Sequence, residues 1–175
     1  GLLFTADPYS KVIDHDDKKT ATLFGDGATV TLLTEDPVFD FGKFVFGSDG
    51  SKKEGIIVRG DGHVHMNGRA VFTFTVRVIP NSIQEMVEKN GMTLEIIDRF
   101  LLHQGSLHIV NSIADTLGVP REKCPFNSAE FGNTVSSSVP MILAQEFNNQ
   151  EMKVAVLAGF GVGLSWASTL IFRKI

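Results

Sequence analysis

The sequence predicts an α/β protein in which helices cover a mixed β-sheet, and three features indicate this fold class. Short runs rich in β-branched residues alternate with stretches whose apolar residues recur every three or four positions. Turn residues, mainly Gly, Pro, Asn and Asp, separate these runs. The chain has 175 residues, 43% of them hydrophobic and 21% charged, which is enough to bury a core.

The strands are predicted from apolar alternation and from the turn residues that bound each run. The chain opens on an apolar strand, and Gly25-Asp26-Gly27 predicts a hairpin or tight bend between the next two strands. After the opening one, we expect strands at residues 21–24, 29–34, 43–46, 55–58, 63–66, 100–102, 154–158 and 165–172.

Three helices are predicted from apolar spacing. The first covers residues 69–89 in two pieces, because Pro80 removes a backbone donor from the middle of the pattern. The second covers residues 106–117 and stops at Gly118. The third runs from 137 to 147, where Pro140 is tolerated because it falls in the first turn.

Residues 154–172 carry no charge, and the stretch is long enough for a membrane span. Gly159, Gly161 and Gly163 stand at alternate positions, and each would weaken a helix by about 1 kcal/mol. We therefore expect two buried strands around a glycine loop and no membrane association.

Charge and cysteine usage exclude several classes of protein. Sixteen Lys and Arg against twenty Asp and Glu give a net charge of −4 without a basic block, which excludes a nucleic-acid footprint. The single cysteine, Cys124, cannot form an intrachain disulfide, so we expect a reducing, cytoplasmic setting. The start lacks both an initiator Met and a signal-peptide pattern, and we expect the chain to be cut from a longer protein.

Two polar residues and one glycine loop are candidates for chemistry. His103 follows a predicted strand, where side chains of α/β folds open onto a ligand crevice. Asn133 follows Gly132 just before a helix. Taken singly, the first is more often a hydrogen-bonded structural histidine and the second a helix cap. The loop 159–163 lacks the G-x-G-x-x-G spacing and suits either an oxyanion site or a tight crossover.

Other reactive residues give weaker signals. His63 and His65 share a strand face, but no third ligand has suitable spacing, so we expect no metal. Cys124 has basic neighbours, but no helix N-terminus follows it and Pro125 constrains the site, so a nucleophile is disfavoured. The common hydrolase and NTPase motifs are missing from the sequence.

Five motifs in order closely resemble the β-ketoacyl-acyl carrier protein synthase III family of the thiolase superfamily. The resemblance covers nearly the whole chain and is weakest between residues 37 and 62. The chain corresponds only to the C-terminal half of such an enzyme, together with the last strands of the N-terminal half. The motifs are Phe24-Gly25-Asp26-Gly27-Ala28, Leu102-His103-Gln104-Gly105-Ser106, Phe131-Gly132-Asn133-Thr134, Ser138-Val139-Pro140 and Gly159-Phe160-Gly161-Val162-Gly163-Leu164-Ser165-Trp166.

The resemblance implies a thiolase-like fold and a division of the chain. Each half of such an enzyme has a mixed five-stranded sheet layered with helices, and two copies pair as a homodimer. Residues 1–36 would be the remnant of the N-terminal half, and residues 37–175 would form the C-terminal half.

The resemblance also implies an acyltransferase reaction without a cofactor. Such enzymes join an acyl group, delivered by coenzyme A and held on a cysteine, to malonyl-acyl carrier protein with loss of carbon dioxide. His103 and Asn133 match the family's catalytic histidine and asparagine, which donate to the oxygen where negative charge develops. The nucleophilic cysteine would lie upstream of Gly1, so this chain alone is expected to be inactive. A second oxyanion hole would use backbone N–H groups of Gly161, Val162 and Gly163.

The sequence departs from the family at two supporting positions. The usual His-Gln-Ala-Asn reads His103-Gln104-Gly105-Ser106, so Gln104 is kept while Ser106 replaces an asparagine that orients the catalytic side chains. His108 stands where the family often has an arginine implicated in docking the carrier protein. These changes favour a specialised ketosynthase as one alternative to fatty-acid initiation.

Two further interpretations stay open at this point. A non-catalytic scaffold or partner subunit is one, although the retention of both His103 and Asn133 counts against it. A thiolase-like enzyme is disfavoured, because that branch uses a second cysteine near the C-terminal loop.

Overall fold

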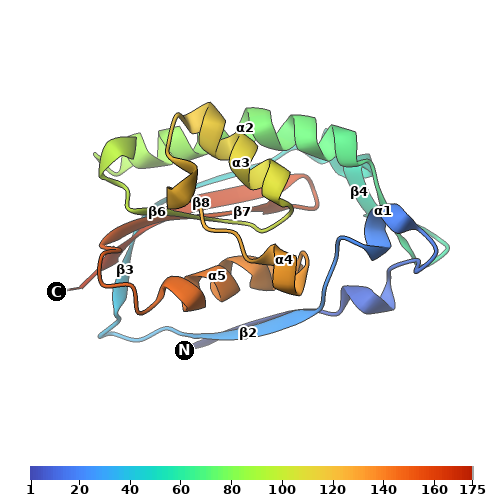
Figure 1. Ribbon diagram of the computed structural model, residues 1–175, viewed down its shortest axis with the longest axis horizontal. Coiled ribbons are helices and arrows are strands. Elements are labelled where there is room, and N and C mark those ends of the chain that lie inside the picture. The colour runs from blue at the N-terminus through green and yellow to red at the C-terminus, as the bar shows by residue number, and fades with distance from the viewer. Residues whose placement is uncertain (175) are drawn as a thin grey trace.

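Helices cover both faces of a four-stranded mixed sheet in the computed structural model, which describes residues 1–174 (Figure 1). The strand order is β3-β8-β7-β6, and the β6–β7 pair is parallel while the other two pairs are antiparallel. The bounds are β3 Phe39–Ser48, β6 Arg99–Leu102, β7 Val154–Gly161 and β8 Ser165–Arg173.

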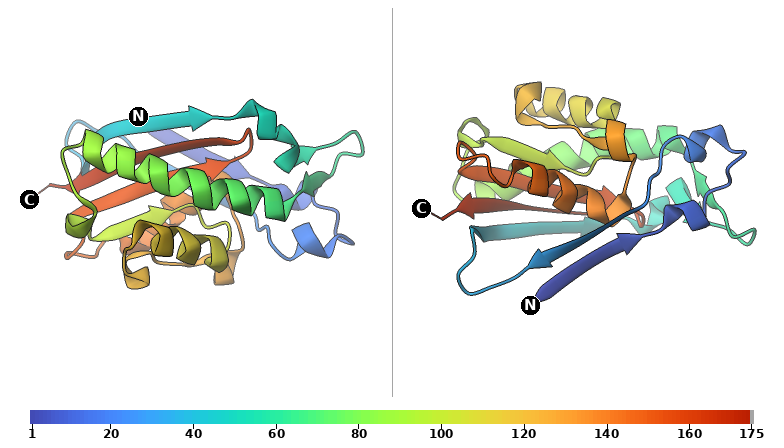
Figure 2. Two further views of the ribbon diagram at one scale, coloured as in Figure 1. Left: turned by 90° about the horizontal axis from the view of Figure 1, so that it is seen from above. Right: turned by 60° about the horizontal axis from the view of Figure 1, so that its bottom comes forward.

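Two helices lie on one face of this sheet and one on the other. Helices α2 (Gly68–Lys89) and α3 (Leu107–Leu117) pack together on the first face, and α2 runs across that face for its whole length (Figure 2). Helix α5 (Ser138–Glu146) covers the opposite face, where it contacts β6 and β7. The strands at the centre are therefore largely buried on both sides, which explains the continuous apolar run of β7.

Alternation along the strands divides the core into two clusters. Phe100 and Leu102 of β6 point towards α2 and α3, whereas Leu101 between them points towards α5. The larger cluster joins Ile79, Ile83, Met86, Phe100, Leu102, Val110, Ile113, Val156 and Leu170. The smaller one joins Leu101, Ile142, Met152, Ala155 and Ile171.

A second, two-stranded sheet lies beneath α5. Strands β1 (Leu2–Asp7) and β2 (Gly27–Leu32) pair antiparallel, and β2 contacts α5, so that α5 separates the two sheets (Figure 1). Large apolar side chains of this two-stranded sheet remain exposed, namely Leu2, Leu3, Phe4, Val30 and Leu32. The remaining elements are α1 (Lys18–Ala21), β4 (Ile56–Val58), β5 (Val64–Met66) and α4 (Ser128–Phe131), with 3₁₀ turns at Tyr9–Lys11, Gly50–Gly55, Leu94–Ile96, Arg121–Lys123 and Val135–Ser137.

Several sequence predictions are confirmed. Helix α3 begins after Ser106 as its N-cap and ends at Gly118, which has a left-handed φ of 70°. Helix α5 carries Pro140 in its first turn. The uncharged stretch 154–172 forms the two strands β7 and β8, as expected. Within residues 1–174, no helix combines the length and hydrophobicity needed to cross a membrane.

The prediction of a strand at residues 21–24 is wrong. Asp17 caps the short helix α1 instead, because its carboxylate accepts hydrogen bonds from the Lys19 N–H (3.1 Å) and the Thr20 hydroxyl (3.0 Å). Gly25-Asp26-Gly27 accordingly does not close a hairpin between residues 21–24 and β2, which pairs with β1. A pairing between strands so far apart in sequence leaves no local signal.

The predicted break at Pro80 is also wrong, since α2 is continuous through that residue. A proline inside a helix costs about 3 kcal/mol. Pro80 is buried together with Ile79, Ile83 and Met86, and the burial of this apolar face offsets the lost backbone hydrogen bond.

The expected five-stranded sheet has four strands in residues 1–174. The other strand limits shift by a few residues. Strand β3, for example, is longer than the predicted 43–46, because it pairs with β8 from Phe39 to Ser48 with an irregularity between Phe41 and Phe44.

Candidate functional site

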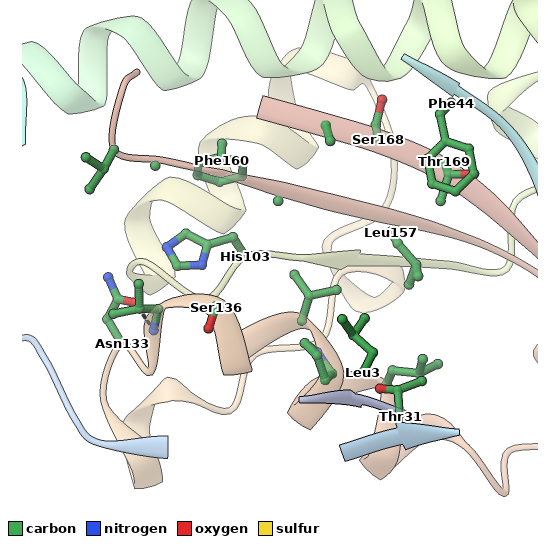
Figure 3. A pocket seen from close by; sticks show the side chains of 18 of the residues that line it. Leu3, Thr31, Phe44, His103, Asn133, Ser136, Leu157, Phe160, Ser168 and Thr169 are labelled. Carbon is green, nitrogen blue, oxygen red and sulfur yellow. Dashed lines mark hydrogen bonds between the residues drawn. The ribbon is translucent and has the colours of Figure 1, made fainter. Parts of the chain in front are cut away.

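A cavity of about 610 Å³ opens between the four-stranded sheet, the start of α5 and the two-stranded sheet. Because β6 and β7 are parallel, their carboxyl ends meet at one edge of the sheet, and His103 and Phe160 lie there. Figure 3 shows His103 and Asn133 at one end of the cavity, with Leu3 and Thr31 towards the other. Most of the lining is apolar, and His103 and Asn133 are the two polar residues at their end of the cavity that match the sequence predictions.

His103 directly follows β6, and both its backbone and its ring are fixed. Its N–H donates a 2.8 Å hydrogen bond to the carbonyl of Ala158 on β7. The ring atom Nδ1 lies 2.7 Å from the hydroxyl oxygen of Ser138, the first residue of α5. The ring packs perpendicular to the ring of Phe160, with centroids 5.2 Å apart and planes at 85°.

The His103 ring is neutral at neutral pH. Burial lowers its pKa from 6.5 to about 4, and a backbone hydrogen bond with Val135 acts in the opposite direction. A neutral imidazole carries one N–H donor and one acceptor nitrogen. The ring can therefore offer a hydrogen-bond donor to a ligand oxygen but carries no positive charge.

Asn133 is held by backbone contacts with the glycine motif that begins at Gly25. Phe24 and Asn133 form an isolated parallel bridge. The N–H of Asn133 donates to the carbonyl of Leu23 (2.8 Å), and the N–H of Gly25 donates to the carbonyl of Asn133 (3.1 Å). Two motifs that are distant in the sequence thereby fix the backbone on either side of this side chain.

The side chain of Asn133 has a defined orientation. Its Oδ1 accepts a 3.0 Å hydrogen bond from the N–H of Val135, which leaves the Nδ2 amide hydrogens for the cavity. Val135 has a φ of 52°, a left-handed conformation that is strained for a β-branched residue. The strained turn places this amide N–H donor on the same cavity as His103.

Residues 159–161 of the predicted glycine loop continue strand β7, and the turn to β8 begins at Val162. Gly161 pairs with Ser165, and Val162 follows it outside the ladder with 56% of its surface exposed. Gly161 and Val162 line the cavity. Gly163 does not line it, and its φ of 138° together with a close approach to Ser165 excludes a larger residue. The predicted loop thus borders the cavity through residues 159–162, first as the end of β7 and then as the hairpin turn.

The two predicted supporting residues, Gln104 and Ser106, do not line the cavity. Gln104 is buried and joins three backbone groups: its Nε2 donates to the carbonyls of Leu102 (2.8 Å) and Pro125 (3.3 Å), and its Oε1 accepts from the N–H of Asn127 (3.0 Å). The Ser106 hydroxyl accepts from the N–H of Ile109 (3.3 Å) as a helix cap. Both residues stabilise the segment around His103 and do not touch its ring.

The remaining candidates lie elsewhere. Cys124 is packed in the larger core cluster, and burial, followed by the charge of Glu122, raises its pKa to about 12. His65 Nε2 lies 2.7 Å from the Asp61 carboxylate on the surface, while His63 Nδ1 is buried without a partner. In the part of the chain that the structure describes, no group of three His, Cys, Asp or Glu side chains is arranged to hold a metal.

Ser138 and Phe160 contact the His103 ring but were given no role from the sequence. Both fall within motifs that carry the family resemblance, which is the available signal. The sequence does not distinguish Ser138 from the adjacent Ser136 and Ser137, because only the start of α5 determines which hydroxyl faces His103.

Comparison with known sequences agrees with this geometry. The family described as 3-oxoacyl-[acyl-carrier-protein] synthase III matches residues 1–50, and its C-terminal region matches residues 87–172. The fold and the polar end of the cavity define a thiolase-like α/β protein. The chain belongs to the 3-oxoacyl-[acyl-carrier-protein] synthase III family.

Individual relatives give the extent of the similarity. The β-ketoacyl-[acyl-carrier-protein] synthase III of Streptococcus mutans is 36% identical over 190 residues, covering 98% of this chain and 58% of the relative. The crystal structure of 3-oxoacyl-(acyl carrier protein) synthase III from Pseudomonas aeruginosa is 31% identical with a TM-score of 0.90, covering 99% of this chain and 58% of that one.

A third relative comes from a different kind of pathway. The priming β-ketosynthase of the R1128 polyketide pathway is 28% identical with a TM-score of 0.85, covering 99% of this chain and 57% of that one. The chain therefore spans little more than half the length of the relatives it matches.

Proposed function

We propose that this chain supplies the hydrogen-bond donors for a decarboxylating Claisen condensation between an acyl thioester and malonyl-acyl carrier protein. The observation that carries the proposal is that His103 and Asn133 line one cavity, each with a side-chain donor available to it. The family to which the chain belongs supports the assignment of substrates.

The chemistry requires donors that are in place before the reaction. When the malonyl thioester loses carbon dioxide, the electron pair of the broken C–C bond moves onto the thioester oxygen as an enolate. An imidazole N–H of His103 and the Nδ2–H of Asn133 stabilise that charge, and the loss of one such donor costs about 10²–10³ in rate. A neutral His103 suits this role, because its pKa of about 4 keeps the ring uncharged at neutral pH.

The apolar part of the cavity supports the same reaction. Side chains such as Leu143, Leu157 and Phe160 line it with apolar surface. Water would protonate the enolate before it attacks the acyl thioester, so a dry cavity favours carbon–carbon bond formation over simple decarboxylation. Of the three residues expected to form the second oxyanion hole, Gly161 and Val162 line the cavity, and their backbone N–H groups serve the oxyanion that forms when the enolate attacks.

The acyl-carrying thiol comes from outside this chain. Cys124 lies in the core and its raised pKa of about 12 keeps the thiol protonated. Residues 1–36 belong to an N-terminal half and residues 37–175 to a C-terminal half of a longer enzyme. The exposed apolar side chains on β1 and β2 fit burial against the rest of that enzyme or a second copy of it.

The carrier surface differs from the family pattern. His108 stands at the family's arginine position and stacks on Phe72, with centroids 4.6 Å apart and planes at 6°. A serine cap at Ser106 replaces the family asparagine. These changes are the basis for the alternative function, a specialised ketosynthase with a different acyl carrier protein, beside fatty-acid initiation.

Release of labelled carbon dioxide from malonyl-acyl carrier protein tests the proposal. The assay uses this chain together with a second polypeptide, the portion of the Streptococcus mutans relative that the chain does not cover. We expect His103→Ala and Asn133→Ala each to reduce the rate about 10²–10³-fold. Ser112→Ala is a matched control away from the cavity and should leave the rate unchanged.

Two results would count against the proposal. Equal rates for the wild type and both variants would favour a non-catalytic scaffold, especially if carrier-protein binding persisted. Incubation of the chain alone with radiolabelled acyl-coenzyme A is the second check, and a stable thioester on Cys124 would overturn the assignment of the thiol to another segment.

A further inference from the structure

Three consecutive serines at the start of α5 each bind a different part of the molecule. Ser136 donates from both its N–H (3.1 Å) and its hydroxyl to the carboxylate of Asp7 on β1. The hydroxyl of Ser137 donates to the carbonyl of Gly27 on β2 (3.0 Å). The hydroxyl of Ser138 meets Nδ1 of His103 at 2.7 Å. The turn is thus anchored to the two-stranded sheet on one side and to the His103 ring on the other.

The hydrogen-bond inventory of Ser138 determines the direction of its bond to the ring. The residue is 1% exposed, so water does not reach its hydroxyl. The oxygen accepts a 3.4 Å hydrogen bond from the N–H of Gln104. Among the described residues, the one acceptor within hydrogen-bond distance of the hydroxyl hydrogen is His103 Nδ1. A buried hydroxyl hydrogen without an acceptor is costly, so Ser138 donates and Nδ1 accepts.

The consequence lies on the other ring nitrogen. A neutral imidazole has one proton, and an accepting Nδ1 leaves that proton on Nε2. The opposite tautomer would present a lone pair at Nε2, which would repel an oxyanion. Phe160, packed perpendicular to the ring, and the His103 backbone bond to Ala158 hold the ring plane in place.

We propose that Ser138 is a positioning residue that donates its hydroxyl hydrogen to Nδ1 of His103 and thereby keeps the ring proton on Nε2. Its importance for catalysis rests on the proposed function, but the tautomer itself does not. Ser138 acts through His103 and does not touch substrate. The two neighbouring serines fix the turn from which it acts.

Nitrogen-15 NMR of the His103 ring in this 175-residue chain tests the proposal directly. Protonated and unprotonated ring nitrogens have well-separated shifts, and couplings to the ring carbons' hydrogens identify which nitrogen is which. At pH 7 we expect a protonated Nε2 and an unprotonated Nδ1. A wild-type proton on Nδ1, directed at Ser138 or at the Val135 carbonyl, would overturn the proposal without any variant.

Variants then test whether Ser138 is responsible. Ser138→Ala should give a mixture of tautomers, whereas Ser138→Thr, which keeps the hydroxyl, should retain the Nε2–H form. Ser137→Ala is the matched control, because it removes an adjacent buried hydroxyl that does not contact the ring. An unchanged tautomer in Ser138→Ala would contradict the proposal. Should that variant fail to fold, the wild-type and Ser138→Thr spectra still decide.

The activity assay separates this proposal from the proposed function. With the complementing polypeptide present, Ser138→Ala should release carbon dioxide about tenfold more slowly, and Ser138→Thr should recover most of the rate. If the tautomer changes as expected but His103→Ala leaves the rate unaltered, the proposed function fails and the role of Ser138 stands. If His103→Ala reduces the rate but the tautomer does not change in Ser138→Ala, the role proposed for Ser138 fails and the proposed function stands.

Discussion

The backbone of Gly25 passes so close to that of Phe131 that a Cβ atom on Gly25 would lie 1.9 Å from the Phe131 carbonyl oxygen. This contact brings the Gly25-Asp26-Gly27 motif against the segment that carries Asn133. The glycine is thus required for space and not for an unusual φ. Asn133 reaches the cavity because two backbone segments can approach this closely.

Gly25→Ala is therefore expected to destabilise the chain strongly. Backbone atoms cannot move aside cheaply, so we predict a loss of at least about 2 kcal/mol in the free energy of unfolding, measured by urea denaturation. Gly105→Ala is the matched control. Its Cβ would lie 3.6 Å from His103 Nε2, an ordinary contact, and should stabilise the chain by about 0.4–1 kcal/mol. Equal effects of the two substitutions would contradict the packing described.

Gln104→Ala should destabilise the chain by roughly 3–5 kcal/mol, because three buried backbone groups lose their partner at about 1–3 kcal/mol each. Urea denaturation with an unchanged slope measures this effect. Gln145→Ala is the control, since that exposed side chain bonds to the nearby Asn127 and should change stability by less than about 0.5 kcal/mol. A small effect at Gln104 would show that the 125–127 segment is held in another way.

Substitutions at Ser106 test whether this residue caps helix α3 or orients the catalytic side chains. Ser106→Ala removes the N-cap of α3 and should cost about 1 kcal/mol of unfolding free energy, whereas Ser106→Asn should be nearly neutral because asparagine caps equally well. Thermal unfolding compares the two variants. A Ser106→Ala variant with full stability would exclude the capping role.

Stability should depend on pH through His103. Its pKa falls from 6.5 to about 4 on folding, so between these values the unfolded chain binds a proton that the folded chain does not. The free energy of unfolding therefore decreases as the pH is lowered from 7 to 4, by about 3 kcal/mol from this group. His103→Gln removes the contribution of this ring to the pH dependence. When the profile of unfolding free energy against pH for the variant is subtracted from that of the wild type, the contributions of the carboxylates cancel. Parallel profiles would show that the ring is not buried as described.

Local signals made part of the fold predictable. Helix α3 follows from the Ser106 cap, the apolar spacing and the Gly118 stop, all of which lie within one segment. The continuity of α2 through Pro80 depends on burial against the sheet, and the β1–β2 pairing joins segments with α1 between them. Tertiary contacts override the local propensity of Pro80 to break the helix, and they pair β1 with β2 without a signal in the local sequence.

The candidate site divides in the same way. Spacing alone favours structural roles for His103 and Asn133, and only the family resemblance predicts that the two act together. Their catalytic roles stay predictions, as do those of Gly161, Val162 and Gly163. The sequence does not predict the role of Ser138, because three consecutive serines are equivalent in sequence and differ only in the groups that their hydroxyls contact.

The central claim is that His103 and Asn133 donate to one enolate oxygen, and NMR of a bound analogue tests it most directly. Only this chain is labelled with nitrogen-15, the complementing polypeptide is unlabelled, and the ligand is a malonyl thioester analogue with a nitronate in place of the enolate. We predict that the His103 Nε2–H and Asn133 Nδ2–H signals shift together and saturate at the same ligand concentration. A bound analogue that shifts one signal, or neither, would contradict the account.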